Sequence, residues 1–362
     1  MADYLYLHVP FCRTICFYCD FCHTVYTREQ ASQWLAALQQ ELAGRNLNRA
    51  LKTIYIGGGT PTALDADQLE QLLQLLDPYR EHVQEYTVEI NPESLDEAKA
   101  GLLEEHGVNR ASLGFQTSDP QLLKAMNRRH TCADVQRAVE MLRRHGIENL
   151  SLDLMYSLPG QTMAQLEQSV RDALAMQPAH LSLYSLNVEP DTVFGRRGLK
   201  PLDDDAEADM YEWICRTLPE HGYHQYEISN FCLPGRESVH NTAYWKYLDF
   251  YGVSAGASGK EGRHRYDKPK SLAAYCRDPL ACTDIPLSEK ESMFEMLMMS
   301  LRLKQGLDQE AFAEAYGKTA DEAWGPVKAK LIRRGLLQEQ GRQLACTDRG
   351  YEILNDVLEE FL

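Results

Sequence analysis

The sequence of 362 residues lacks the features that would place it in a membrane, outside the cell or on nucleic acid. No apolar run approaches the roughly 18 residues of a membrane-spanning helix. The N-terminus, MADYLYLHVPFC, has no basic stretch before an apolar run, so we expect no secretory signal. Basic residues are scarce, since 37 Lys and Arg stand against 53 Asp and Glu, giving a net charge of −16. We therefore expect a cytoplasmic protein without a nucleic-acid partner.

Cysteines are present in an uneven distribution. Of the ten, four lie between positions 12 and 22, and the other six are scattered singly. Thiols stay reduced in the cytosol, so the clustered cysteines indicate a metal site rather than disulfides. The scattered ones are expected to pack as small apolar residues.

Short β-rich runs alternate with helical patterns through the first half of the chain. Six runs are predicted as strands: Tyr4–Val9, Thr53–Gly58, Tyr86–Asn91, Arg110–Phe115, Asn149–Met155 and His180–Val188. Five amphipathic segments between them are predicted as helices: Arg28–Ala43, Ala66–Leu76, Leu95–His106, Ala133–His145 and Met163–Met176. This alternation predicts an α/β fold, a partial (β/α)6 TIM-like barrel with ligands at the carboxyl ends of its strands.

The pattern changes in the second half. A helix at Asp205–His221 and a strand at Tyr223–Phe231 precede an aperiodic stretch, Leu233–Gly262, where we expect the barrel pattern to end. Helical segments and a short hairpin follow from Ser288 and resemble a small winged helix. Residues 287–362 carry 10 Lys and Arg against 14 Asp and Glu, which favours packing or partner contact over DNA binding. We expect a core domain over 1–235, a connecting region over 236–286 and a C-terminal helical, winged-helix-like domain over 287–362.

The cysteine cluster has the spacing C-x3-C-x2-C, formed by Cys12, Cys16 and Cys19 in the loop after the first strand. Three thiolates on one loop can hold three irons of a cubane cluster and leave the fourth open to a small molecule. A structural zinc site is the alternative, but it usually draws paired ligands from separated knuckles.

This motif in a βα-repeat protein resembles the radical S-adenosylmethionine (SAM) superfamily. The resemblance implies a [4Fe-4S] cluster whose fourth iron binds the amino and carboxylate groups of SAM. Cys22 stands three residues after Cys19, whereas the HemN branch of that superfamily has its fourth cysteine two residues after the third. We predict that Cys22 is not a ligand.

Glycines and polar residues at the ends of the predicted strands form a candidate SAM site. The run Gly57–Pro61 follows the second strand, and its glycines allow the backbone to approach a ligand and present N–H groups. Arg128 can pair with a carboxylate, and Glu89 or Asp153 can accept hydrogen bonds from an ammonium or a ribose. The set resembles the HemN/HemW family, and the resemblance implies SAM contacts at Tyr6, Tyr18, Gly58, Gly59, Thr60, Glu89, Gln116, Arg128, Asp153 and Asn187.

Two features separate the branches of that family. Only 11 residues precede Cys12, whereas the oxidase branch carries a substantial N-terminal segment over its substrate. The run His240-Asn-Thr-Ala-Tyr244-Trp245 matches the H-N-x-x-Y-W motif of the HemW branch, where it is associated with haem binding. An imidazole can ligate haem iron and aromatic rings can flank a macrocycle, so His240, Tyr244 and Trp245 are haem candidates.

The resemblance therefore implies a haem chaperone that carries a SAM-bound [4Fe-4S] cluster and passes haem to haem proteins, including membrane-associated respiratory enzymes. The alternative is an oxygen-independent coproporphyrinogen III oxidase, which decarboxylates propionates, so enzymatic activity stays open. A radical SAM enzyme acting on RNA is disfavoured by the net charge of −16.

Overall fold

The computed structural model describes all residues, 1–362, and contains a twelve-stranded sheet with the strand order β14-β13-β12-β11-β1-β4-β5-β6-β7-β8-β10-β9. Six consecutive strands in the middle of this sheet pair in parallel. They are β1 (Tyr4–Val9), β4 (Thr53–Gly58), β5 (Glu85–Ile90), β6 (Arg110–Gln116), β7 (Asn149–Tyr156) and β8 (His180–Ser185). The six predicted strands are all present, and the α/β prediction of a partial barrel is confirmed.

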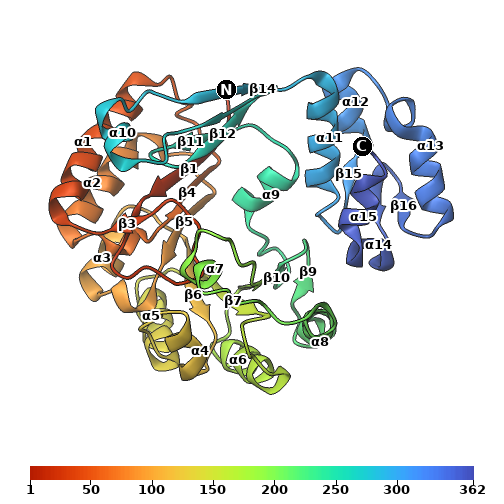
Figure 1. Cartoon of the computed structure of the whole chain (residues 1–362). Coiled ribbons are helices and arrows are strands. Elements are labelled where there is room, and N and C mark those ends of the chain that lie inside the picture. The colour runs from red at the N-terminus through yellow and green to blue at the C-terminus, as the bar shows by residue number, and fades with distance from the viewer.

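Helices cover the outer face of the parallel strands (Figure 1). They are α1 (Arg28–Gly44), α2 (Ala66–Leu76), α3 (Glu97–Glu105), α4 (Pro120–Ala125), α5 (Cys132–Arg144) and α6 (Met163–Ala175). In α5 a capping box between Thr131 and Asp134 starts the helix, and its buried residues follow a helical period: Val135, Ala138, Val139 and Leu142. Such faces contribute to a core cluster of 53 buried residues behind the sheet.

The sheet continues beyond the predicted barrel. The aperiodic stretch and the predicted connecting region contribute β11 (Phe250–Val253), β12 (Ser258–Glu261), β13 (His264–Asp267) and β14 (Thr283–Pro286). Strand β11 pairs in parallel with β1, with Tyr4 opposite Phe250, so the sheet continues through a stretch in which no strand was predicted. The predicted strand at Tyr223–Phe231 is instead an antiparallel pair, β9 (His224–Gln225) and β10 (Asn230–Cys232).

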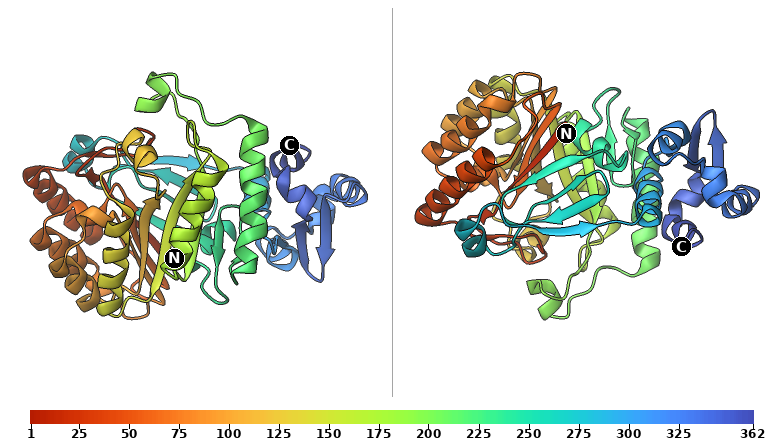
Figure 2. Two further views of the ribbon diagram at one scale, coloured as in Figure 1. Left: turned by 90° about the horizontal axis from the view of Figure 1, so that it is seen from below. Right: turned by 90° about the horizontal axis from the view of Figure 1, so that it is seen from above.

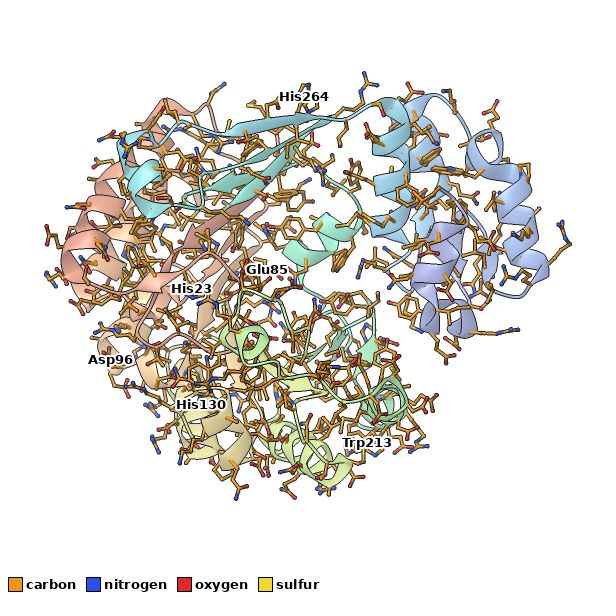
Figure 3. All side chains as sticks on the ribbon, in the orientation of Figure 1. His23, Glu85, Asp96, His130, Trp213 and His264 are labelled. Atoms are coloured by element: carbon orange, nitrogen blue, oxygen red, sulfur yellow. The ribbon has the colours of Figure 1, made fainter.

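A short helix, α9 (Val239–Trp245), is anchored to the inner face of the sheet. The buried carboxylate of Glu85 on β5 accepts hydrogen bonds from the Ser238 hydroxyl and from the backbone N–H groups of Val239 and His240. These acceptors satisfy the free amides at the start of a helix. Figure 3 labels Glu85 beside α9.

The remaining helices belong either to the sheet domain or to a C-terminal domain that has its own core. Helices α7 (Val193–Arg196), α8 (Asp204–Glu220) and α10 (Leu272–Arg277) belong to the sheet domain, and α8 stands on the side that faces the C-terminal helices (Figure 2). The C-terminal domain has its own core of 17 buried residues. Its elements are α11 (Glu289–Ser300), β15 (Leu307–Asp308), α12 (Gln309–Tyr316), α13 (Ala320–Arg333), β16 (Leu337–Gln340), β17 (Gln343–Cys346), α14 (Asp348–Glu352) and α15 (Leu354–Glu359).

None of the helices combines the length and the apolar character that crossing a bilayer requires.

Candidate functional site: a thiol-lined cavity in the barrel

A cavity of about 380 Å³ opens on the inner face of the parallel sheet. Alternate residues of β6 line it over the whole strand: Arg110, Ser112, Gly114 and Gln116. Side chains of a strand alternate between its two faces, so this period shows that one face of β6 forms the wall. The loop after β1 forms the end of the cavity at the carboxyl ends of the strands.

The three predicted cluster cysteines all line this cavity. Their loop is held from the opposite side of the barrel, because the Asn127 amide donates to the Ile15 carbonyl (2.8 Å) and the Phe17 N–H donates to the Met126 carbonyl (3.1 Å). Burial raises the pKa of Cys12 to about 11 and that of Cys19 to about 12. Three soft donors on one anchored loop beside a cavity fit an iron-sulfur cluster, whose binding would displace the thiol protons.

Cys22 lies away from the other three. Its thiol donates to the Lys270 carbonyl at 2.9 Å, and it is not among the residues that line the cavity. The fourth cysteine of the run therefore faces the segment between β13 and α10 rather than the candidate cluster site.

The glycine loop after β4 lies against the cluster loop. Gly58 has φ = +106°, and a Cβ on Gly59 would lie 2.6 Å from the Phe11 carbonyl oxygen, so both positions need glycine. The amides are already used, since Gly59 N–H donates to the Val9 carbonyl and Thr60 N–H to the Phe11 carbonyl. The expectation that this loop offers free N–H groups to a ligand is therefore wrong for these two positions.

Glu89 supplies the carboxylate of this region. Its two oxygens accept hydrogen bonds from the Tyr55 hydroxyl (2.8 Å) and the Gly58 N–H (3.0 Å). Burial raises the pKa of Glu89 to about 7 despite these donors. The carboxylate lines the cavity, so it can accept a hydrogen bond from a ligand ammonium when it is ionised.

Arg128 is the cation at the cluster end of the cavity. It is 9 % exposed, its Nη2 donates to the Gly114 carbonyl (2.9 Å), and its Nη1 lies 3.5 Å from the Cys16 sulfur. Its Nε is buried without a partner. Beside it, Gln116 adopts φ = +63° after an irregularity in the β6–β7 pairing. Such backbone strain is typical of ligand-binding positions.

Most of the other residues predicted to contact SAM line the same cavity. These are Tyr18, Gly58, Gly59, Thr60, Asp153 and Asn187. Asp153 accepts hydrogen bonds from the Ser112 and Ser151 hydroxyls, and burial raises its pKa. Tyr6 does not line the cavity, because its hydroxyl bonds to His8 and its ring packs against Tyr55.

Several cavity residues escaped the sequence analysis. They are Tyr55, Asn91, Arg110, Tyr184 and Asn241. Tyr55 precedes the glycine loop by two positions, and Tyr184 lies near the end of β8, so strand alternation was an available signal for both. Asn241 had no such signal, since its position depends on how α9 docks.

The haem candidates His240, Tyr244 and Trp245 lie on α9, and none of them lines the cavity. His240 is fully buried; its Nδ1 bonds to the Thr53 hydroxyl (2.6 Å) and its Nε2 to the Tyr244 hydroxyl (2.7 Å). Neither ring nitrogen is open to an iron, and burial lowers the pKa of His240 to about 3. Trp245 packs under the Arg302 guanidinium. Because both ring nitrogens of His240 already have partners, this geometry gives no support to its prediction as an axial ligand, and Asn241 is the motif residue that lines the cavity.

Comparison with known proteins agrees with this architecture. Residues 6–173 match the model of the radical SAM superfamily, and residues 287–353 match the HemN C-terminal domain. The fold is similar to that of the coproporphyrinogen III oxidase HemN from Escherichia coli, with a TM-score of 0.84 and 22 % identity over 99 % of this chain and 89 % of that one.

Two curated relatives are similar over almost their full length. The heme chaperone HemW of Lactococcus lactis is 39 % identical, with 99 % of this chain and 96 % of the relative covered. The heme chaperone HemW of Bacillus subtilis is 38 % identical, with 99 % and 98 % covered. The fold and the thiol-lined cavity define a radical SAM protein, a class that implies SAM and a [4Fe-4S] cluster. Within that class, the chain belongs to the HemW family.

The separation of Cys22 from the cavity predicts unequal roles for the cysteines. We expect Cys16→Ser to lose most of the iron and sulfide that the wild-type chain takes up on anaerobic reconstitution, because a cluster needs all three thiolates of the loop. Cys22→Ser is the matched control and is expected to keep wild-type iron and sulfide content. Loss of iron from Cys22→Ser would contradict this assignment.

The raised pKa of Glu89 predicts that SAM binding depends on pH. The ionised carboxylate accepts hydrogen bonds from the SAM amino group more strongly than the protonated acid does, so the affinity for SAM should fall by up to about tenfold between pH 8 and pH 6. Calorimetric titration of the reconstituted protein measures this change. Glu89→Gln should bind more weakly and lose the pH dependence, whereas the exposed control Glu140→Gln should keep it. An unchanged pH profile in Glu89→Gln would exclude this role.

Proposed function

We propose that this protein is a haem chaperone of the HemW type, which binds haem and delivers it to haem-dependent proteins. The observation that carries the proposal is the similarity to HemW chaperones over nearly the whole chain, including 96 % of the Lactococcus lactis relative. The recipients in this proposal include membrane-associated respiratory enzymes. The site of action is the cytoplasm, where the thiols of the cluster loop stay reduced.

The proposal includes a SAM-bound cluster in the barrel cavity. Cys12, Cys16 and Cys19 would hold the cluster, with Glu89 toward the SAM ammonium and Arg128 toward its carboxylate. The unpartnered Nε of buried Arg128 supports this placement, since a carboxylate would complete its hydrogen bonds. When bound, the cluster supplies an electron donor beside the SAM sulfonium.

The remaining predicted residues would surround the rest of SAM. Hydroxyl, amide and carboxylate groups for a ribose or an adenine come from four residues that line the same cavity: Tyr18, Gln116, Asp153 and Asn187. Thr60 is held in place by the Asn91 amide, which donates to its hydroxyl at 2.9 Å. Tyr6 acts through Tyr55 and His8 in this proposal rather than by direct contact.

The deciding experiment compares haem binding with porphyrinogen turnover. The reconstituted protein is titrated anaerobically with haem while the Soret band is followed, and in parallel it is incubated with coproporphyrinogen III, SAM and a reductant. We expect stoichiometric haem binding without decarboxylation. Decarboxylation with matching amounts of 5′-deoxyadenosine, in the absence of stable haem binding, would assign the protein to the oxidase branch instead.

The buried contacts of His240 predict a structural effect of its replacement. His240→Ala leaves the Thr53 and Tyr244 hydroxyls without their partner, so the free energy of unfolding should fall by about 2–4 kcal/mol. Unfolding in denaturant measures this loss. In the absence of denaturant, where the variant is folded, the number of haem molecules bound per chain should equal that of the wild type. Tyr244→Phe is the control, because it frees the Nε2 of His240. Lost haem binding with unchanged stability would restore His240 as the iron ligand.

A further inference from the structure

Arg110 is a buried cation whose hydrogen-bonding capacity is unused. It is the first residue of β6 and is 1 % exposed, and its Nε and Nη1 atoms are buried without a hydrogen-bond partner. Its one ion-pair contact is with Glu85, whose Oε2 lies 3.9 Å from Nε. Each unsatisfied buried donor costs about 1–3 kcal/mol, and more when the group is charged. The guanidinium therefore needs an acceptor that the protein does not provide.

The acidic groups near Arg110 are already bonded to other donors. The Glu85 oxygens accept three hydrogen bonds from the start of α9. The Asp153 oxygens accept from the Ser112 and Ser151 hydroxyls. The Tyr55 hydroxyl and the Gly58 N–H occupy Glu89. These donors take up part of the accepting capacity of each carboxylate. Glu85 is the one that lies within ion-pair distance of Arg110, at 3.9 Å, and it forms no hydrogen bond with the guanidinium.

Arg110 lines the barrel cavity at the far end from the cluster loop. Arg110 and Gln116 are the first and last residues of β6, so their Cα atoms lie about 20 Å apart along the strand. Gln116 belongs to the part of the wall that we assign to SAM. In the register of the sheet, Glu89 lies opposite Ser112 and Asp153 opposite Gly114. Arg110 therefore lies at least one inward position farther from the cluster loop than these two SAM candidates.

Two further groups bring polar and aromatic surface to the same cavity. Tyr184 on β8 lines the wall and is 42 % exposed, so its ring is open to a ligand. Asn241 comes from α9, and its side chain forms no hydrogen bond with another side chain. The cavity is thus lined by a phenol ring, an amide that can donate and accept hydrogen bonds, and a guanidinium that can only donate them.

We infer that this cavity contains a carboxylate-binding subsite built on Arg110. The planar guanidinium matches a carboxylate through two parallel hydrogen bonds, and a neutral or cationic group would leave the buried charge uncompensated. A carboxylate can come from the propionate of a tetrapyrrole, which rests on the proposed function, or from a small free carboxylate. Tyr184 would flank the apolar part of a tetrapyrrole.

The first part of the test compares haem with haem dimethyl ester, in which both propionates are neutral. Both are titrated into the reconstituted wild-type protein and into Arg110→Gln, Arg110→Lys and the exposed control Arg137→Gln. We expect the wild type and the control to bind the ester at least tenfold more weakly than haem. Arg110→Gln should bind both equally, and Arg110→Lys should lie between. Iron content and thermal unfolding verify that each variant is folded.

The second part uses sodium propionate as the probe and the thermal midpoint as the readout, and it needs no haem. If wild type binds haem and the ester equally but propionate raises the midpoint of wild type and not of Arg110→Gln, the subsite takes a small free carboxylate. If wild type shows neither an ester effect nor a propionate effect, the inference is overturned. If wild type binds neither haem nor ester, the proposed function fails and the propionate result alone decides the subsite.

Should Arg110→Gln fail to fold, the wild-type comparisons still decide. A tenfold preference for haem over the ester, or a rise in the wild-type midpoint with propionate that equal sodium chloride does not produce, supports a carboxylate subsite. Absence of both overturns it.

Discussion

The hydrogen bonds between Glu85 and the start of α9 are the contact on which the cavity depends. A helix of seven residues has little stability of its own, because nucleating a helix is unfavourable and few internal bonds follow. The buried carboxylate on β5 satisfies the amides of Val239 and His240 and so fixes the helix against the sheet. That anchoring turns His240 toward Thr53 and leaves Asn241 on the cavity wall.

The polar interior of the barrel comes from the residues that the parallel strands turn inward. Closed barrels of this type are usually filled by branched apolar side chains, whereas here β6 turns Arg110 and Ser112 inward and β7 turns Asp153 inward. The serine hydroxyls donate to Asp153, and burial raises the pKa of Glu89 to about 7, so this carboxyl group is only about half ionised at pH 7. A partial barrel with small and polar inward residues keeps an open volume in place of a packed core. The cavity is therefore a property of the strand sequences rather than of a loop.

Local patterns in the sequence were sufficient for the parallel strands and for the cysteine loop. The strands Tyr4–Val9 and Thr53–Gly58 were predicted with their observed bounds, because both are β-rich runs and a proline follows the first and glycines end the second. The β11 strand was missed because it is four residues long and is stabilised by pairing with β1, about 245 residues earlier in the chain.

In the site, too, features that depend on neighbouring residues were predicted, and features that depend on contacts between distant segments were not. The spacing of Cys12, Cys16 and Cys19 predicted one shared site on a single loop, and in the structure all three line the same cavity. The motif that begins at His240 was found, but the sequence did not indicate that Asn241 is its residue on the cavity. The direction of the side chains on α9 depends on contacts with Glu85 on β5 and Thr53 on β4. These two residues lie far from α9 in the sequence, so no local pattern could predict the contacts.

The pairing of β1 with β11 also bears on the order in which the protein can mature during synthesis. Strand β1 and the cysteine loop are made before β11, so one edge of β1 stays without its partner until Phe250–Val253 has been made. An unpaired strand edge is prone to wrong associations. Iron loaded before that point would meet a loop whose supporting strand is paired on one side only. Cofactor insertion after release of the full chain is therefore the order that the topology favours.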